Sequence, residues 1–109
     1  MSDRTRRIAE LNDKLRTRGE GGLVMMTSGV DNRGPEFVSA AIEAVRTFAT
    51  FTPDNNPHGE RDFGGFTVAD EKLFWKIDYY NPAMDGGSED PADPERTVRL
   101  LTIMLAAEY

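Results

Sequence analysis

The feature that most constrains this chain is an alternation of side-chain character over residues 72–80. Every second residue is large and apolar, which places these side chains on one face of a β-strand: Leu73, Trp75, Ile77 and Tyr79. The opposite face is mixed, and we expect it to be only partly covered: Phe74, Lys76, Asp78 and Tyr80. The chain must therefore build a sheet with one well-buried face.

Residues 63–69 supply the natural antiparallel partner of this strand. They are rich in β-forming residues, and a turn at Asp70–Glu71 would join the two strands as a hairpin. The register that keeps the large side chains on a shared face makes three pairs: Val68 with Leu73, Phe66 with Trp75, and Gly64 with Ile77.

Two helices and one more strand are predicted ahead of the hairpin. Residues 4–18 carry a narrow apolar stripe at helical spacing, and Gly19 is well placed to cap the helix end. Residues 23–27 form a short apolar run typical of a buried strand. Pro35 opens a second helix with a wide apolar face, which we expect to end near Thr50.

The last element is predicted to be a helix. Asp93, Pro94 and Glu95 form a strong helix-start signal, and apolar residues follow through to the C-terminus. The order α-β-α-β-β-α predicts a compact two-layer α+β domain with a small three-stranded sheet, a β-hairpin and a terminal helix. The first strand lies either parallel beside the second, through a right-handed crossover, or at the far edge of the sheet.

The length of 109 residues fits one domain, spanning residues 1–109. No cysteine is present, so disulfides and thiolate metal sites are excluded. No apolar run is long enough to cross a membrane, and the N-terminus lacks the apolar stretch of a secretory signal. We therefore expect a cytoplasmic protein with no membrane partner and no cofactor. The sequence leaves the oligomeric state open.

Charge is distributed unevenly along the chain. Residues 1–18 hold six basic and three acidic side chains, whereas residues 54–95 hold eleven acidic and three basic ones. The formal net charge of −6 repels nucleic-acid phosphates, so we expect no direct nucleic-acid binding. An acidic surface suits a protein partner with a basic surface, or serves solubility alone. A regulator that touches nucleic acid through the basic first helix is the third alternative.

Three separated blocks resemble one known family, and together they span nearly the whole chain: Phe51 to Gly64, Phe74 to Tyr80, and Leu101 to Tyr109. The sequence is similar to the domain-of-unknown-function family numbered 3768, small alphaproteobacterial proteins often encoded on plasmids and phage-like elements. The resemblance implies no activity. It implies a mobile-genetic-element setting, which favours an inhibitor of a host defence or a regulator of transfer. Family members often have Asp at the position of Asn56 and His at the position of Arg61.

The loop of residues 54–62 concentrates oxygen and nitrogen donors. Asp54, Asn56 and His58 echo the spacing of a calcium-binding loop, but its twelfth position is Gly65 instead of Glu. The same donors can hold the loop itself together through side-chain turns. They can also present a partner-binding surface. These three interpretations stay open from the residues alone.

Hairpin geometry brings this loop and the loop of residues 81–93 to the same end of the sheet. The acidic and aromatic residues of a predicted binding surface gather there: Asp54, Glu60, Asp62, Asp85, Glu89, Asp90, Phe74 and Tyr80. We expect a binding or inhibitory protein that occludes a basic, nucleic-acid-binding partner by charge mimicry.

An enzyme is the alternative. A small metal-dependent or acid–base hydrolase would use His58 as general base, with Asp54, Glu60 and Asp62 as carboxylate partners. No serine of the chain lies in a recognised nucleophile motif.

Overall fold

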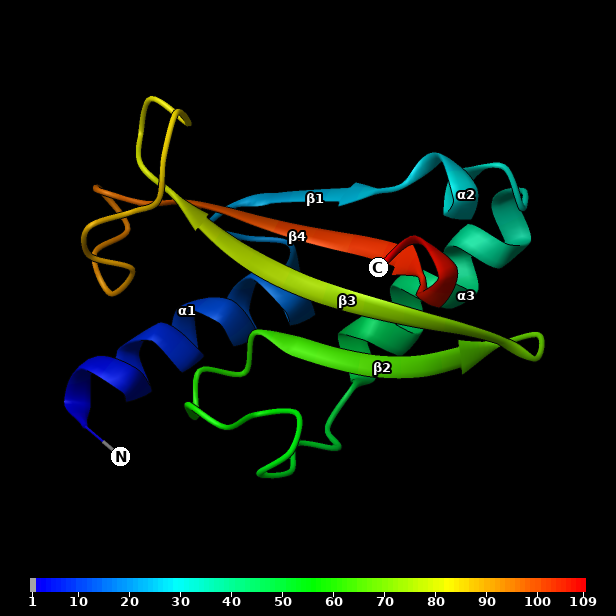
Figure 1. Ribbon diagram of the computed structural model, residues 1–109, viewed down its shortest axis with the longest axis horizontal. Helices are drawn as coiled ribbons and strands as arrows, with labels where there is room; N and C mark the ends of the chain where they lie inside the picture. The colour runs from blue at the N-terminus through cyan, green and yellow to red at the C-terminus, as the bar shows by residue number, and fades with distance from the viewer. Residues whose placement is uncertain (1) are drawn as a thin grey trace.

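The computed structural model describes residues 2–109, and within them it contains a four-stranded mixed sheet and three α-helices (Figure 1). The helices are α1 (Asp3–Arg18), α2 (Ser28–Asp31) and α3 (Pro35–Thr47), and a 3₁₀ turn, η1 (Ala106–Glu108), ends the chain. The strands are β1 (Leu23–Met26), β2 (Phe63–Val68), β3 (Glu71–Tyr80) and β4 (Val98–Leu105). Their order in the sheet is β1-β4-β3-β2.

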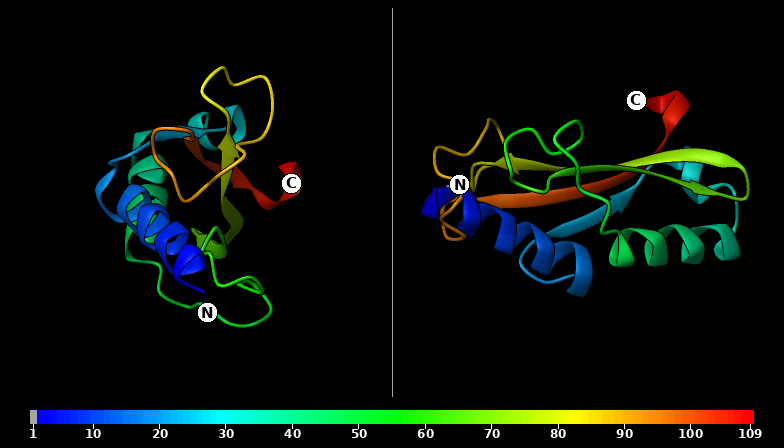
Figure 2. Two further views of the ribbon diagram at one scale, coloured as in Figure 1. Left: turned by 90° about the vertical axis from the view of Figure 1, so that its left-hand side faces the viewer. Right: turned by 90° about the horizontal axis from the view of Figure 1, so that it is seen from below.

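The two long helices pack on one face of the sheet. Seen from below, α1 and α3 form a layer under the strands, whereas η1 lies on the opposite side (Figure 2). The core fills the space between the layers, and it includes Leu15, Val45, Trp75 and Leu101. The two-layer α+β class is therefore confirmed. None of the helices within residues 2–109 is long and apolar enough to cross a membrane.

The predicted terminal helix is wrong, because residues 98–105 form β4 instead. Arg99, Leu101 and Ile103 are buried at every second position, the period of a strand. The residues of the helix-start signal form a single turn instead, in which the Arg96 amide donates to the Asp93 carbonyl at 3.1 Å. The added strand makes the sheet four-stranded instead of three-stranded.

The hairpin exists, but its register differs from the prediction by two residues. Ala69 and Asp70 both have positive φ and form a two-residue turn, so Phe66 pairs with Leu73 and Gly64 pairs with Trp75. A shift of two leaves every side chain on its predicted face. Gly64 is required at its position, because a methyl group there would overlap the Trp75 indole and lie 2.7 Å from Phe48 Cζ.

The first strand does not pair with either strand of the hairpin. β1 runs parallel to β4, with Val24 opposite Leu101, and it forms the edge of the sheet remote from β2. The N-terminal helix follows its prediction closely. Ser2 Oγ accepts from the Thr5 amide at 3.1 Å, and Gly19 ends the helix in the left-handed conformation.

Candidate functional site

The two acidic loops lie at the same end of the sheet, as the hairpin predicts. The loop before β2 and the loop after β3 lie at the end that also holds the start of α1 (Figure 1). The Ile77 amide donates to the Asp62 carbonyl at 2.8 Å and so extends the pairing of β2 and β3 toward the first loop. The two loops carry the acidic residues of the predicted binding surface, whereas Phe74 lies nearer the hairpin turn, opposite Gly65.

A cavity of about 460 Å³ opens at this end between the first loop and β3. Its size lies within the range of small-ligand pockets. The lining comes from the loop, the start of β2, the middle of β3 and the C-terminal residue: Asp54, Asn55, Pro57, His58, Asp62, Phe63, Lys76, Ile77, Asp78 and Tyr109. Three of the predicted site residues, Asp54, His58 and Asp62, are therefore brought together, and β3 adds two charged groups.

Aromatic rings form one wall of this cavity. The rings of Phe63 and Tyr109 are 5.7 Å apart, and each lies 5.2 Å from the ring of Phe74. The predicted interface residue Phe74 is thus half-buried within an aromatic cluster on the helix-free face. Tyr80 is also half-buried on this face and forms a bridge with Gly87.

Asp62 has the most perturbed electrostatic environment in the cavity. Burial raises the pKa of its carboxyl group, and the nearby charge of Glu60 raises that pKa further, whereas a backbone hydrogen bond and the neighbouring His58 offset part of the increase. Lys76 does not relieve Asp62 directly, because its ammonium group pairs with Asp78 at 3.2 Å. A cation entering the cavity would stabilise the ionised form of Asp62.

Glu60 does not share this cavity. Its carboxylate accepts a hydrogen bond from the Tyr79 hydroxyl at 2.9 Å, and its carbonyl accepts from Asn12 Nδ2 at 2.9 Å. The Asn12 side chain also accepts from Arg99 Nε at 2.9 Å, and Arg99 is almost fully buried. Burial raises the pKa of Tyr79 and lowers that of Arg99. Glu60 therefore belongs to a buried network that joins α1 to the sheet.

The asparagine side chains in the middle of the loop hold its backbone in place. Asn56 Oδ1 accepts from the Arg61 amide at 2.8 Å, and Asn55 Oδ1 accepts from the Thr52 amide at 2.8 Å. Arg61 needs this support because its φ of 56° lies in the left-handed region. Within residues 2–109, no cluster of three or more His, Cys, Asp or Glu side chains is arranged to hold a metal ion.

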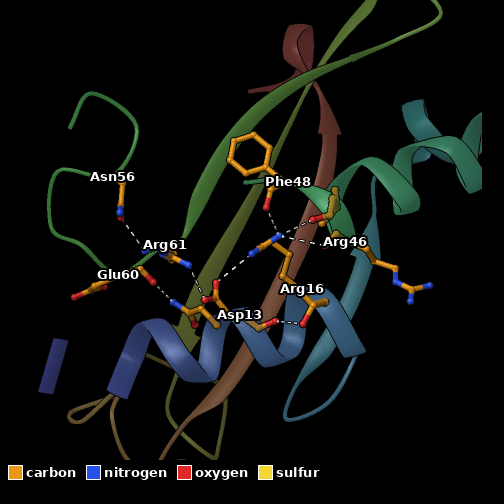
Figure 3. A network of polar contacts seen from close by, with 10 residues as sticks. Asp13, Arg16, Arg46, Phe48, Asn56, Glu60 and Arg61 are labelled. Carbon is orange, nitrogen blue, oxygen red and sulfur yellow. Dashed lines mark hydrogen bonds and ion pairs between the residues drawn. The ribbon is translucent and has the colours of Figure 1, made fainter. Parts of the chain in front are cut away.

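An arginine network that the sequence did not reveal fixes the loop to the helices (Figure 3). Arg16 is buried and donates to the carbonyls of Val45 at 3.0 Å and Phe48 at 2.7 Å. Asp13 bridges Arg16 and Arg61 at 3.1 and 3.0 Å. The ring of Phe51 contacts both guanidinium groups, 5.4 Å from Arg16 and 4.9 Å from Arg61. The network sets the position of the loop that carries the cavity.

The acids of the second loop lie outside the cavity and have partners of their own. Glu89 pairs with Arg96 at 3.0 Å, and Asp90 pairs with Arg4 of the first helix at 3.5 Å. Asp85 accepts from Asn81 Nδ2 at 2.8 Å. The tertiary structure thus supplies basic partners to a segment that is wholly acidic in sequence.

Comparison with known proteins identifies one family. Residues 26–108 match the family described as Protein of unknown function (DUF3768), which is most of the chain but leaves out α1. No curated protein and no solved structure gives a significant match. The matched range contains the cavity-lining loop, all of β2 to β4, and Phe63 and Phe74 of the aromatic cluster, whereas Tyr109 lies just outside it. The chain therefore belongs to the DUF3768 family.

Proposed function

We propose that this protein binds a basic protein partner and occludes it, with the cavity at the end of the sheet receiving an arginine or lysine side chain. The observation that carries the proposal is the half-buried position of the Asp62 carboxyl group in the cavity lining. This carboxyl group lies beside other carboxylates, and its pKa is raised. An incoming cation removes this electrostatic penalty, so binding energy is available there that an exposed acid would not provide.

The chemistry of the cavity fits a guanidinium group well. Asp54 and Asp62 offer carboxylate oxygens, which guanidinium binds through paired hydrogen bonds. Phe63 and Tyr109 offer ring faces on which a cation can stack. The combination favours a basic side chain over a neutral or anionic ligand.

The second acidic loop would serve a different purpose. Glu89 and Asp90 already have exposed arginine partners, and such surface pairs contribute little energy. Together with the net charge of −6, these acids would attract a basic partner at long range and speed the encounter. A partner that normally binds nucleic acid would meet carboxylates in place of phosphates, which is consistent with an inhibitory role on a mobile element.

The experiment begins with a tagged pull-down from the native host, followed by association kinetics with the partner that mass spectrometry identifies. Asp62→Asn should weaken the complex mainly through faster dissociation. The triple variant Asp85→Asn, Glu89→Gln, Asp90→Asn should instead slow association and flatten its salt dependence. Asp70→Asn, at the turn on the opposite end of the hairpin, is the control with a matched charge change. Equal kinetics for Asp62→Asn and Asp70→Asn would refute the role of the cavity.

An acid–base hydrolase is the second candidate, because His58 and Asp62 line the same cavity as Lys76. His58 would act as general base on a water molecule, since the described cavity lining contains no serine or threonine. The discriminating experiment measures turnover of phosphoester and carboxylic-ester panels. Turnover that His58→Ala abolishes, with an unchanged melting temperature, would replace the binding proposal.

A further inference from the structure

The outer edge of β1 is an unprotected strand edge. β1 pairs with β4 on one side, and the described residues provide no strand on its other side. Of the five large hydrophobic residues that are exposed within residues 2–109, three are consecutive in β1: Leu23 at 48%, Val24 at 45% and Met25 at 54%. Proteins normally shield such edges with charges, proline or bulges. The sequence Leu-Val-Met-Met contains none of these.

A second cavity lies directly beneath this edge. It has a volume of about 240 Å³ and extends between β1, β4 and the helix layer. Its apolar lining is Leu15, Val24, Ile42, Val45, Leu101 and Ile103. Val24 pairs with Leu101, so it is on the helix-facing side of the sheet, whereas Leu23 and Met25 are on the helix-free side. A strand added beside β1 would direct alternate side chains toward this cavity.

Arginine side chains accompany the apolar lining. Arg18, at the end of α1, and Arg46, at the end of α3, both line the cavity. Arg46 has one acidic partner, Glu43, at the long distance of 4.0 Å, and both of these side chains are largely exposed. This corner of an otherwise acidic protein is therefore locally basic. It complements an acidic ligand, in contrast to the cavity on the helix-free face between the first loop and β3.

We propose that an extended segment of an acidic partner protein adds to the sheet as a fifth strand beside β1. One apolar side chain of the segment fills the cavity under Val24, and a neighbouring carboxylate contacts Arg18 or Arg46. Main-chain hydrogen bonds to β1 provide affinity, and the apolar and acidic positions provide specificity. A second copy of this chain fits less well, since a twofold pair would bring the same arginines together.

The test uses synthetic peptides that alternate Glu with Val and Leu, measured by titration calorimetry against the full chain. A matched peptide with Lys in place of Glu should bind at least about tenfold more weakly. Reversing both charges, as Arg18→Glu with Arg46→Glu, should exchange the preference of the two peptides. Equal binding of both peptides by the wild-type chain would overturn the proposal.

Strand addition has its own signature. N-methylation of alternate peptide amides on the edge that faces β1 should abolish binding, whereas methylation of the other edge should not. Val24→Lys places a charge on the helix-facing side of the edge strand and should remove binding. Thr67→Lys, on the exposed part of the opposite edge strand β2, is the control and should leave it intact. A dimer in solution that Val24→Lys dissociates would identify a second copy as the occupant and overturn the proposal.

Discussion

Replacing Trp75 by alanine and by phenylalanine separates two contributions to the stability of this fold. Trp75 is fully buried, and its ring packs edge-on against Phe48 at 5.6 Å and Phe51 at 6.2 Å. Its indole nitrogen is buried without a hydrogen-bond partner within the described residues. The side chain therefore stabilises the core through its area while its N–H group destabilises it.

The two substitutions should differ clearly in their effect on the free energy of unfolding. Trp75→Ala leaves a large cavity and should cost about 3–5 kcal/mol, a large share of the ~5–15 kcal/mol that a domain has. Trp75→Phe keeps the edge-on aromatic packing and removes an unpaired donor, whose burial costs about 1–3 kcal/mol. Because this gain offsets much of the lost contact area, we expect a net cost below about 2 kcal/mol.

The measurement is urea denaturation followed by circular dichroism, since Trp75 is the sole tryptophan and its fluorescence disappears in both variants. Phe74→Ala, on the half-buried helix-free face, is the control and should cost less than Trp75→Ala. Equal costs for the alanine and phenylalanine variants of Trp75 would refute the argument that edge-on aromatic packing at this position stabilises the core. A greater cost for Phe74→Ala would refute the assignment of the buried face.

Four further outcomes are expected. Asp62→Asn should stabilise the fold at neutral pH, because the raised pKa of Asp62 means that its ionised form is disfavoured in the folded state. The gain in melting temperature should vanish once the pH falls below the pKa that Asp62 has in the unfolded chain, where the carboxyl group is protonated in both states. Gly64→Ala should lower the free energy of unfolding by about 1–3 kcal/mol through overlap with Trp75 and Phe48, measurable by urea denaturation. Asp13→Asn should speed amide hydrogen exchange in residues 50–61 by releasing Arg61, whereas Glu10→Gln on the same helix should not. Fluorescence anisotropy should detect no submicromolar binding of duplex or single-stranded DNA at physiological salt, because the net charge opposes it.

The failure of the predicted terminal helix shows where local signals are insufficient. Asp93-Pro94-Glu95 favours a helix start, and Val98, Leu101 and Leu105 are compatible with a helical face. Thr97, Val98, Thr102 and Ile103 are β-branched, and this signal favours a strand over the same residues. Long-range pairing determines that this segment is a strand, because β4 lies between β1 and β3 and forms hydrogen bonds with both. Neither neighbour is apparent from the segment alone.

The candidate site was predictable in part for the same reason. The hairpin places both acidic loops at one end of the sheet, and Asp54, His58 and Asp62 lie together because they belong to the same short loop before β2. The hydrogen-bond and ion-pair partners of the charged residues could not be predicted from the sequence. Asn12 and Arg99, which share a buried hydrogen bond, are 87 residues apart, and Arg4 and Arg96 reach the acidic loop only in the folded chain.

The sequence by itself determined the features that arise within a few residues of one another. The alternation of residues 72–80 fixes which side chains of β3 are buried, and Ser2 and Gly19 fix the ends of α1, because side-chain direction and capping are local properties. The tertiary structure alone decided the hairpin register, the place of β1 at the edge, and the pairing of Arg16 and Arg99 in the core. These depend on packing between segments far apart in the chain, where many arrangements satisfy the same local pattern and only the one that fills the core and satisfies its buried polar groups is stable.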